Sequence, residues 1–322
     1  MTLHEALQLA TRQLESSAEL RADAARDAAF LLRHALAISL AAQLADPDRP
    51  LTPAQQSAYE ALIQRRLRNE PIQYITGEQE FYGLALGVTP AVLIPRPETE
   101  HLVESVLAEF AAHPAASAFH PTTGSCPANP DSHPTNFACH PTAKRRDPLL
   151  PSHSLRILDI GTGSGAIAIA LAHHLPNTQI TAVDLSPAAL AVAAANAARH
   201  GLADRIRFVQ SDLLAAFSTD DLPFDAIVSN PPYVPTADRA TLHPQVRDHE
   251  PSSALFAGAD GLDIYRRLIP QARAALVPNG LLAIEIGHEQ RDPIAALLAD
   301  WFQLRFVDDL QGIPRIALAR KP

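Results

Sequence analysis

The stretch that decides the fold is residues 155–175, which read LRILDIGTGSGAIAIALAHHL. A short apolar run is followed by a loop containing Gly161, Gly163 and Gly165, and then by a longer apolar run of helical length. Glycines let the backbone turn sharply and approach a ligand closely, and a helix that begins there offers free N–H groups. The stretch therefore predicts a strand, a ligand-binding loop and a helix of the kind found at nucleotide sites.

The chain that follows this stretch alternates strands and helices. The further strands are predicted at residues 179–186, 206–212, 224–230, 280–287, 303–309 and 314–321, and the helices at 187–201, 265–276 and 291–301. Seven strands that alternate with helices predict an α/β fold with a mostly parallel, doubly wound sheet. In such sheets ligands bind beyond the carboxyl ends of the strands, near the point where the strand order reverses.

Composition limits the class of protein. The chain has 322 residues, 47% hydrophobic and 19% charged, which is ordinary for a globular protein of two domains. Its formal net charge of −9 argues against a chain built mainly to grip nucleic acid, so no direct nucleic-acid partner is expected. We expect no membrane contact because no apolar run is long enough to span a bilayer and the N-terminus lacks a signal pattern. A cytoplasmic protein, monomeric in solution, is the expectation.

Upstream of the sheet the pattern is helical. Residues 3–14, 18–36 and 52–69 each place apolar side chains on one face, and Thr52 before Pro53 is a plausible helix N-cap. A small helical domain is predicted over 1–70. Short alternating runs punctuated by glycines predict a β-hairpin linker over 71–98. A helix from about Thr99 opens the second domain, 99–322.

A segment at about 113–154 interrupts that second domain. It holds eight of the 28 prolines and five of the 14 histidines, with almost no apolar periodicity. This composition predicts a disordered surface insertion. An alternative is a zinc site made by Cys126, His133, Cys139 and His140, although the spacing lacks a paired short knuckle. These two cysteines are the only ones in the chain, so no disulfide framework is implied.

Acidic residues stand at the tips of the second and third predicted strands. Asp184 suits the two hydroxyls of a ribose, whether the ligand is a dinucleotide or S-adenosylmethionine. The alternative is that Asp184 only caps the helix that starts near Ser186. Asp212 could accept a hydrogen bond from an adenine amino group while Leu213 packs on the ring; the alternative is a loop-capping aspartate.

The fourth predicted strand ends in the tetrapeptide Asn230, Pro231, Pro232, Tyr233. Prolines lack N–H groups and fix φ, so this turn is rigid and presents acceptors. The Asn230 side-chain oxygen and the Pro231 carbonyl can accept both hydrogens of a planar NH2 group, and Tyr233 can stack on the group that carries it. Such a turn suits methylation of a conjugated nitrogen.

These motifs resemble a known family. The tetrapeptide together with LDIGTGSGAIAIA resembles amino-group methyltransferases in general. Residues 70–100, residues 246–269 and the helical N-terminus are similar to the release factor glutamine methyltransferases of the HemK/PrmC type, over nearly the whole chain except the insertion.

The resemblance implies a class I methyltransferase domain with a Rossmann-like fold and a helical substrate-recognition domain. It implies S-adenosylmethionine as cofactor, no metal, and as substrate the glutamine of the Gly-Gly-Gln loop of class I peptide chain release factors, which tunes translation termination. The implied cofactor-binding residues are Gly161, Thr162, Gly163, Ser164, Gly165, Asp184, Asp212, Leu213 and Asn230. The implied catalytic residues are Asn230, Pro231, Pro232 and Tyr233.

Three alternatives stay open. A nucleic-acid adenine methyltransferase shares the tetrapeptide but predicts a basic face. A ribosomal-protein glutamine methyltransferase is expected to share the same tetrapeptide. A non-catalytic binding module is the third alternative, and the intact tetrapeptide and glycine loop argue against it. Arg96, Glu98 and Glu100 could reach the cofactor or form an ion-paired helix start.

Overall fold

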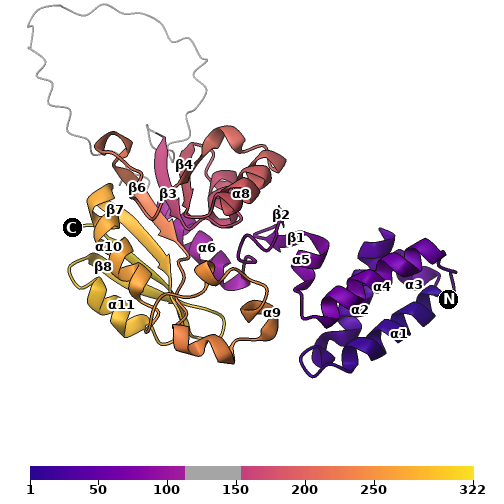
Figure 1. Ribbon diagram of the computed structural model, residues 1–322. Coiled ribbons are helices and arrows are strands. Elements are labelled where there is room, and N and C mark those ends of the chain that lie inside the picture. Colours follow the sequence, from indigo (N-terminus) through magenta and orange to yellow (C-terminus); the bar gives the residue numbers. More distant parts are fainter. Residues whose placement is uncertain (113–153) are drawn as a thin grey trace, which may run out of the picture.

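The computed structural model of the protein describes residues 1–112 and 154–322 (Figure 1). The predicted disordered insertion, including the zinc candidates Cys126, His133, Cys139 and His140, lies almost entirely outside the described residues. Among the described residues, no helix is long and apolar enough to cross a membrane. No cluster of three or more potential metal ligands occurs in this part of the chain.

The N-terminal segment forms a helical bundle at one side of the molecule (Figure 1). Its elements are α1 (Leu3–Glu15), η1 (Arg21–Asp23), α2 (Ala24–Leu36), α3 (Leu40–Ala45), α4 (Pro53–Leu67) and α5 (Ile72–Thr76). The apolar faces of α1, α2 and α4 meet in one core that includes Leu14, Leu31 and Ile63. Thr52 caps α4 as predicted, in a capping box with Gln55. The sequence did not predict the short α3.

A hairpin follows the bundle. β1 (Glu78–Phe81) pairs antiparallel with β2 (Leu84–Gly87) through a two-residue turn in which Tyr82 and Gly83 both have positive φ, 52° and 76°. This turn matches the twist of a hairpin. The Asn196 side chain of α8 (Pro187–Arg199) accepts from the N–H of Gly87 (2.7 Å) and donates to its carbonyl (2.9 Å). The predicted hairpin is therefore present and is fastened to the sheet layer.

The second part of the chain is built on one seven-stranded sheet. Its strands are β3 (Leu155–Ile160), β4 (Thr178–Asp184), β5 (Ile206–Gln210), β6 (Phe224–Ser229), β7 (Leu276–Glu285), β8 (Phe302–Asp308) and β9 (Pro314–Arg320). They lie in the order β5-β4-β3-β6-β7-β9-β8, and in this sheet only β9 runs against the others. The predicted number of strands and their mostly parallel direction are confirmed. The order reverses between β3 and β6, which places a ligand crevice at their carboxyl ends.

Helices cover both faces of this sheet (Figure 1). α6 (Pro97–Ala112), α7 (Ala166–His174) and α8 share a core with one face, whereas α10 (Asp263–Ala275) and α11 (Arg291–Leu297) share a core with the other. Successive strand residues point to opposite faces, so Ile157 belongs to the first core and Leu158 to the second. α6 starts two residues before the predicted Thr99. The remaining short elements are η2 (Ala203–Arg205), η3 (Thr219–Asp221), η4 (Thr236–Thr241), α9 (Pro244–Arg247) and η5 (Ser252–Ala254).

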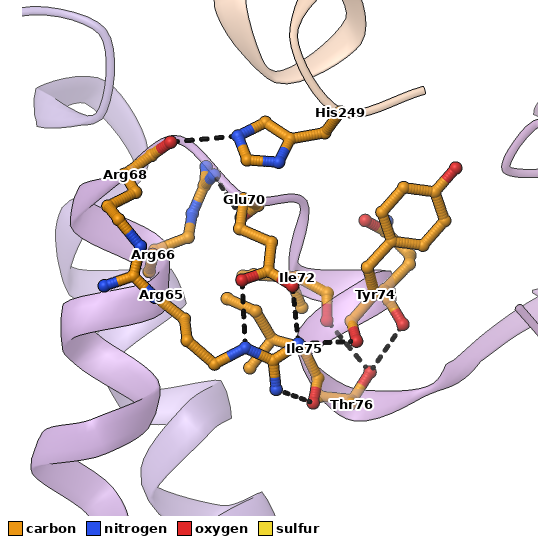
Figure 2. Close-up of polar contacts among 10 residues, drawn as sticks. Arg65, Arg66, Arg68, Glu70, Ile72, Tyr74, Ile75, Thr76 and His249 are labelled. Atoms are coloured by element: carbon orange, nitrogen blue, oxygen red, sulfur yellow. Dashed lines mark hydrogen bonds and ion pairs between the residues drawn. The ribbon is translucent and has the colours of Figure 1, made fainter. Parts of the chain in front are cut away.

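The segment after β6 contacts the N-terminal bundle. The imidazole Nε2 of His249 donates to the carbonyl oxygen of Arg68 (2.9 Å), as Figure 2 shows. Close by, the guanidinium of Arg65 forms two parallel hydrogen bonds with Glu70 (2.9 and 2.5 Å) and donates to the carbonyls of Tyr74 and Ile75. Bidentate pairs of this kind fix geometry as well as adding energy. The end of α4 is thus held against α5 where the chain leaves the bundle.

Candidate functional site

The glycine loop after β3 turns tightly beneath a cavity. The N–H groups of Gly161 and Thr162 both donate to the carbonyl of Val183 at the end of β4 (2.9 Å each). Gly163 has φ +56° and Gly165 has φ +84°, a region that favours glycine. A Cβ on Gly165 would lie 3.0 Å from Ile169 Cδ1 and 3.2 Å from Ala193 Cβ. Glycine at this position lets the loop pack closely against α8.

Asp184 joins the glycine loop to the following helix. Its Oδ2 accepts from the N–H of Gly163 (2.9 Å) and its Oδ1 accepts from the N–H of Ser186 (2.9 Å). The cap of α8 is Ser186, whose hydroxyl accepts from the N–H of Ala189 (3.2 Å), so Asp184 supports the turn ahead of the helix and the interpretation of Asp184 as the cap is wrong. A carboxylate oxygen has two lone pairs, so each can accept a further hydrogen bond. Asp184 also lines the cavity, which keeps the ligand-binding interpretation open.

The turn after β5 brings Asp212 and Leu213 to the same cavity. Asp212 accepts from the guanidinium of Arg267 on α10 (2.6 Å), and both side chains are about half exposed. Leu213 is buried and has φ +52°, an uncommon conformation for a residue with a side chain. Backbone strain of this kind is found most often at functional sites.

The tetrapeptide after β6 faces the glycine loop. β3 and β6 are neighbours, with Ile160 paired to Ser229, so Gly161 and Asn230 leave adjacent strand ends. The amide Nδ2 of Asn230 donates to Thr99 Oγ1 of α6 (3.0 Å). Within residues 1–112 and 154–322, no group donates to Asn230 Oδ1 or to the carbonyl of Pro231. Two acceptors are therefore left open at this turn.

The structure brings most of the predicted site residues together on one cavity. Those that line it are Gly161, Thr162, Gly163, Ser164, Asp184, Asp212, Leu213, Asn230, Pro231 and Pro232. Gly165 and Tyr233 are not among the lining residues. Tyr233 instead packs on the core beneath, where the Gln290 side chain donates to its carbonyl (3.0 Å).

Two buried carboxyl groups next to the site were not predicted from the sequence. Glu285 ends β7, where Thr99 donates to its Oε2 (2.7 Å) and the Tyr233 hydroxyl donates to its Oε1 (3.4 Å). Asp159 in β3 accepts from the Thr162 hydroxyl (2.6 Å). Burial raises the pKa of each carboxyl to about 7, because the charged form loses its hydration. An acidic residue inside an apolar strand run was the available signal for both.

The three charged residues around the start of α6 have different positions. Arg96 lines the cavity and donates to the buried Glu250 carboxylate (2.5 Å). Glu98 and Glu100 lie in the first turn of α6, and neither lines the cavity. Glu100 accepts from the N–H of Tyr82 (2.9 Å), which ties the hairpin turn to α6. The two glutamates therefore lie at the helix start as predicted, but the expected ion pair is not found among the described residues, because Arg96 pairs with Glu250 instead.

Comparison with known proteins agrees with this geometry. Residues 5–77 match the family model of the PrmC N-terminal domain, and residues 147–245 match that of the methyltransferase small domain. A release factor glutamine methyltransferase of Koribacter versatilis is 41% identical over 100% of this chain and 99% of its own length. The chain belongs to the release factor glutamine methyltransferase family.

Further members of the family are similar over most of their length. One from Geobacter sulfurreducens is 39% identical over 90% of this chain and 87% of its own, and one from Bradyrhizobium diazoefficiens is 40% identical over 93% and 89%. Three predictions for this release factor glutamine methyltransferase family member are thereby confirmed: it is a methyltransferase, it has the class I fold, and its cofactor is S-adenosylmethionine.

Proposed function

We propose that this enzyme transfers a methyl group from S-adenosylmethionine to the side-chain amide nitrogen of the glutamine in the Gly-Gly-Gln motif of class I peptide chain release factors. The observation that carries the proposal is the pair of open acceptors at Asn230 and Pro231, which stand beside the glycine loop on adjacent strand ends. A primary amide has two N–H donors that match this pair. The names of the relatives support the same substrate.

The cavity fits the cofactor. The loop of residues 161–165 presents backbone groups, and Asp184 keeps spare lone pairs that suit the ribose hydroxyls. We assign Asp212 and Leu213 to the adenine end, one as an acceptor and the other as an apolar surface. Bound S-adenosylmethionine supplies an electrophilic methyl group on a sulfonium sulfur.

The tetrapeptide would then orient the side-chain amide nitrogen of the substrate glutamine toward the methyl group. Asn230 Oδ1 and the Pro231 carbonyl accept the two amide hydrogens, and Pro232 keeps the turn stiff. Positive charge would develop on the nitrogen as it takes the methyl group, the two acceptors would stabilise that charge, and the released proton would pass to solvent water. Orientation of this kind can lower a barrier by roughly 7 to 11 kcal/mol in favourable systems. Stacking of Tyr233 on the glutamine amide stays a prediction.

The test offers the purified enzyme labelled S-adenosylmethionine with three acceptors in separate reactions: a class I release factor, a ribosomal protein mixture, and DNA. We expect label in the release factor alone, and none in a release factor whose motif glutamine is replaced. Label in the ribosomal protein or in DNA, with none in the release factor, would overturn the proposed substrate in favour of one of the alternatives.

A further inference from the structure

One buried carboxylate is linked to two side chains of the tetrapeptide, to Tyr233 directly and to Asn230 through Thr99. Glu285 is 2% exposed and ends β7, the neighbour of β6. Its Oε1 accepts from the Tyr233 hydroxyl, and its Oε2 accepts from Thr99, which in turn accepts from the Asn230 amide. Glu285 does not line the cavity, so its contact with the site runs through these partners.

The direction of these hydrogen bonds depends on the charge of Glu285. An ionised carboxylate can only accept, so the single Thr99 hydroxyl proton points to Glu285. The Thr99 oxygen is then left as an acceptor, and Asn230 must turn its NH2 group toward it. That orientation presents Asn230 Oδ1 as the open acceptor. A protonated Glu285 can donate to Thr99, and Thr99 can then donate to Asn230 Oδ1, which removes that acceptor.

We propose that Glu285 is a positioning residue that, through Thr99, holds the Asn230 amide with its oxygen available to the reacting nitrogen, and that protonation of Glu285 turns the site off. The inference rests on the proposed role of Asn230 in binding an amide. Glu285 also anchors Tyr233, so one carboxylate fixes both ends of the tetrapeptide.

The surroundings of Glu285 make this protonation accessible near neutral pH. Burial raises its pKa to about 7, and the charge of Glu98 on α6 acts in the same direction. Thr99, Tyr233 and the charge of Arg315 on β9 act against it. From α10, the Tyr265 hydroxyl donates to the Glu285 backbone carbonyl (2.7 Å) rather than to its carboxylate.

The main test is the pH dependence of the single-turnover rate of methyl transfer to a release factor, with the enzyme saturated by cofactor. A carboxyl with a pKa of about 7 goes from roughly nine tenths ionised at pH 8 to one tenth at pH 6, so the wild-type rate should fall about tenfold between them. In Glu285→Gln the rate should be lower at pH 8 and should no longer change across this range. Cofactor affinity should stay within about threefold of wild type.

Matched variants separate positioning from a general loss of structure. Asp159→Asn removes the other carboxyl whose pKa is about 7 and should keep the wild-type pH step. Thr99→Val removes the hydroxyl that joins Glu285 to Asn230 and should lower the rate at least tenfold at pH 8. Thr99→Ser keeps a hydroxyl and should have a rate within about threefold of wild type. If Glu285→Gln does not fold, the Thr99 pair carries the same test. A wild-type pH step that survives in Glu285→Gln or in Thr99→Val overturns the inference.

A readout without substrate keeps this inference separate from the proposed function. The side-chain amide resonances of Asn230, followed by NMR in the wild-type protein, should shift with a midpoint near pH 7 and should not do so in Glu285→Gln. Failure of the enzyme to methylate a release factor would reject the proposed substrate alone. An Asn230 signal that does not titrate would reject the Glu285 link, even in an enzyme that methylates release factors.

Discussion

Asp184→Ala is the substitution that best separates a ligand-binding carboxylate from one that only supports the turns on either side of it. In the folded protein it leaves the N–H groups of Gly163 and Ser186 without their acceptor. Asp184 is only partly buried, so water can replace part of what is lost. We expect the free energy of unfolding without cofactor to fall by about 1 to 3 kcal/mol, measured by urea denaturation.

The effect on cofactor binding should be larger. Two hydrogen bonds from ribose hydroxyls to a carboxylate contribute about 1.5 to 3 kcal/mol each, so their loss amounts to roughly 3 to 6 kcal/mol. The dissociation constant of S-adenosylmethionine should therefore rise by roughly two to four powers of ten. Isothermal titration calorimetry on the folded variant measures it directly.

Thr52→Ala is the matched control. It removes a helix cap in the N-terminal bundle, away from the cavity, and should cost about 1 kcal/mol of stability with no change in cofactor affinity. If Asp184→Ala behaves in the same way, losing stability while binding the cofactor within about threefold of wild type, Asp184 only supports the backbone of the two turns and its assignment to the ribose is wrong.

Three further predictions test other parts of the structure. Asn230→Ala should lower turnover by about two to three powers of ten, the cost of losing one group aimed at developing charge, while cofactor binding stays nearly intact; retention of more than half of wild-type turnover would contradict its role. Arg66→Ala leaves Asp27 buried without its 2.8 Å ion-pair partner and should cost about 3 to 5 kcal/mol in urea unfolding, whereas Arg26→Ala, which removes an exposed partner of Asp27, should cost under about 1 kcal/mol. For Asp159, whose folded pKa is raised from 3.8 to about 7, the penalty for burying the charge is full above pH 7 and absent below pH 4. Asp159→Asn should therefore be more stable than wild type at pH 8, by up to about 4 kcal/mol, and the gap in thermal stability should close by pH 4; an equal gap at both values would contradict it.

The sequence by itself determined the parts of the protein that depend on neighbouring residues. The apolar period changes between strand and helix along the chain, and that period fixed seven strands and the helices between them. Glycines at 161, 163 and 165 permit the positive φ angles of a tight turn, and prolines at 231 and 232 fix φ, so both turns at the ligand cavity could be predicted. The cap at Thr52 and a hairpin within residues 71–98 were also predicted from local signals.

Only the tertiary structure decided how these turns are supported. Thr99 lies 131 residues from Asn230 and 186 from Glu285 in sequence, yet it bonds to both. Nothing in local periodicity encodes such a contact, because it depends on β7 lying beside β6 and on α6 crossing the same strand ends. A buried carboxylate must find hydrogen-bond donors wherever the fold provides them. For this reason the sequence located Asn230 at the site, whereas the packing of α6 and β7 decided which way its amide faces.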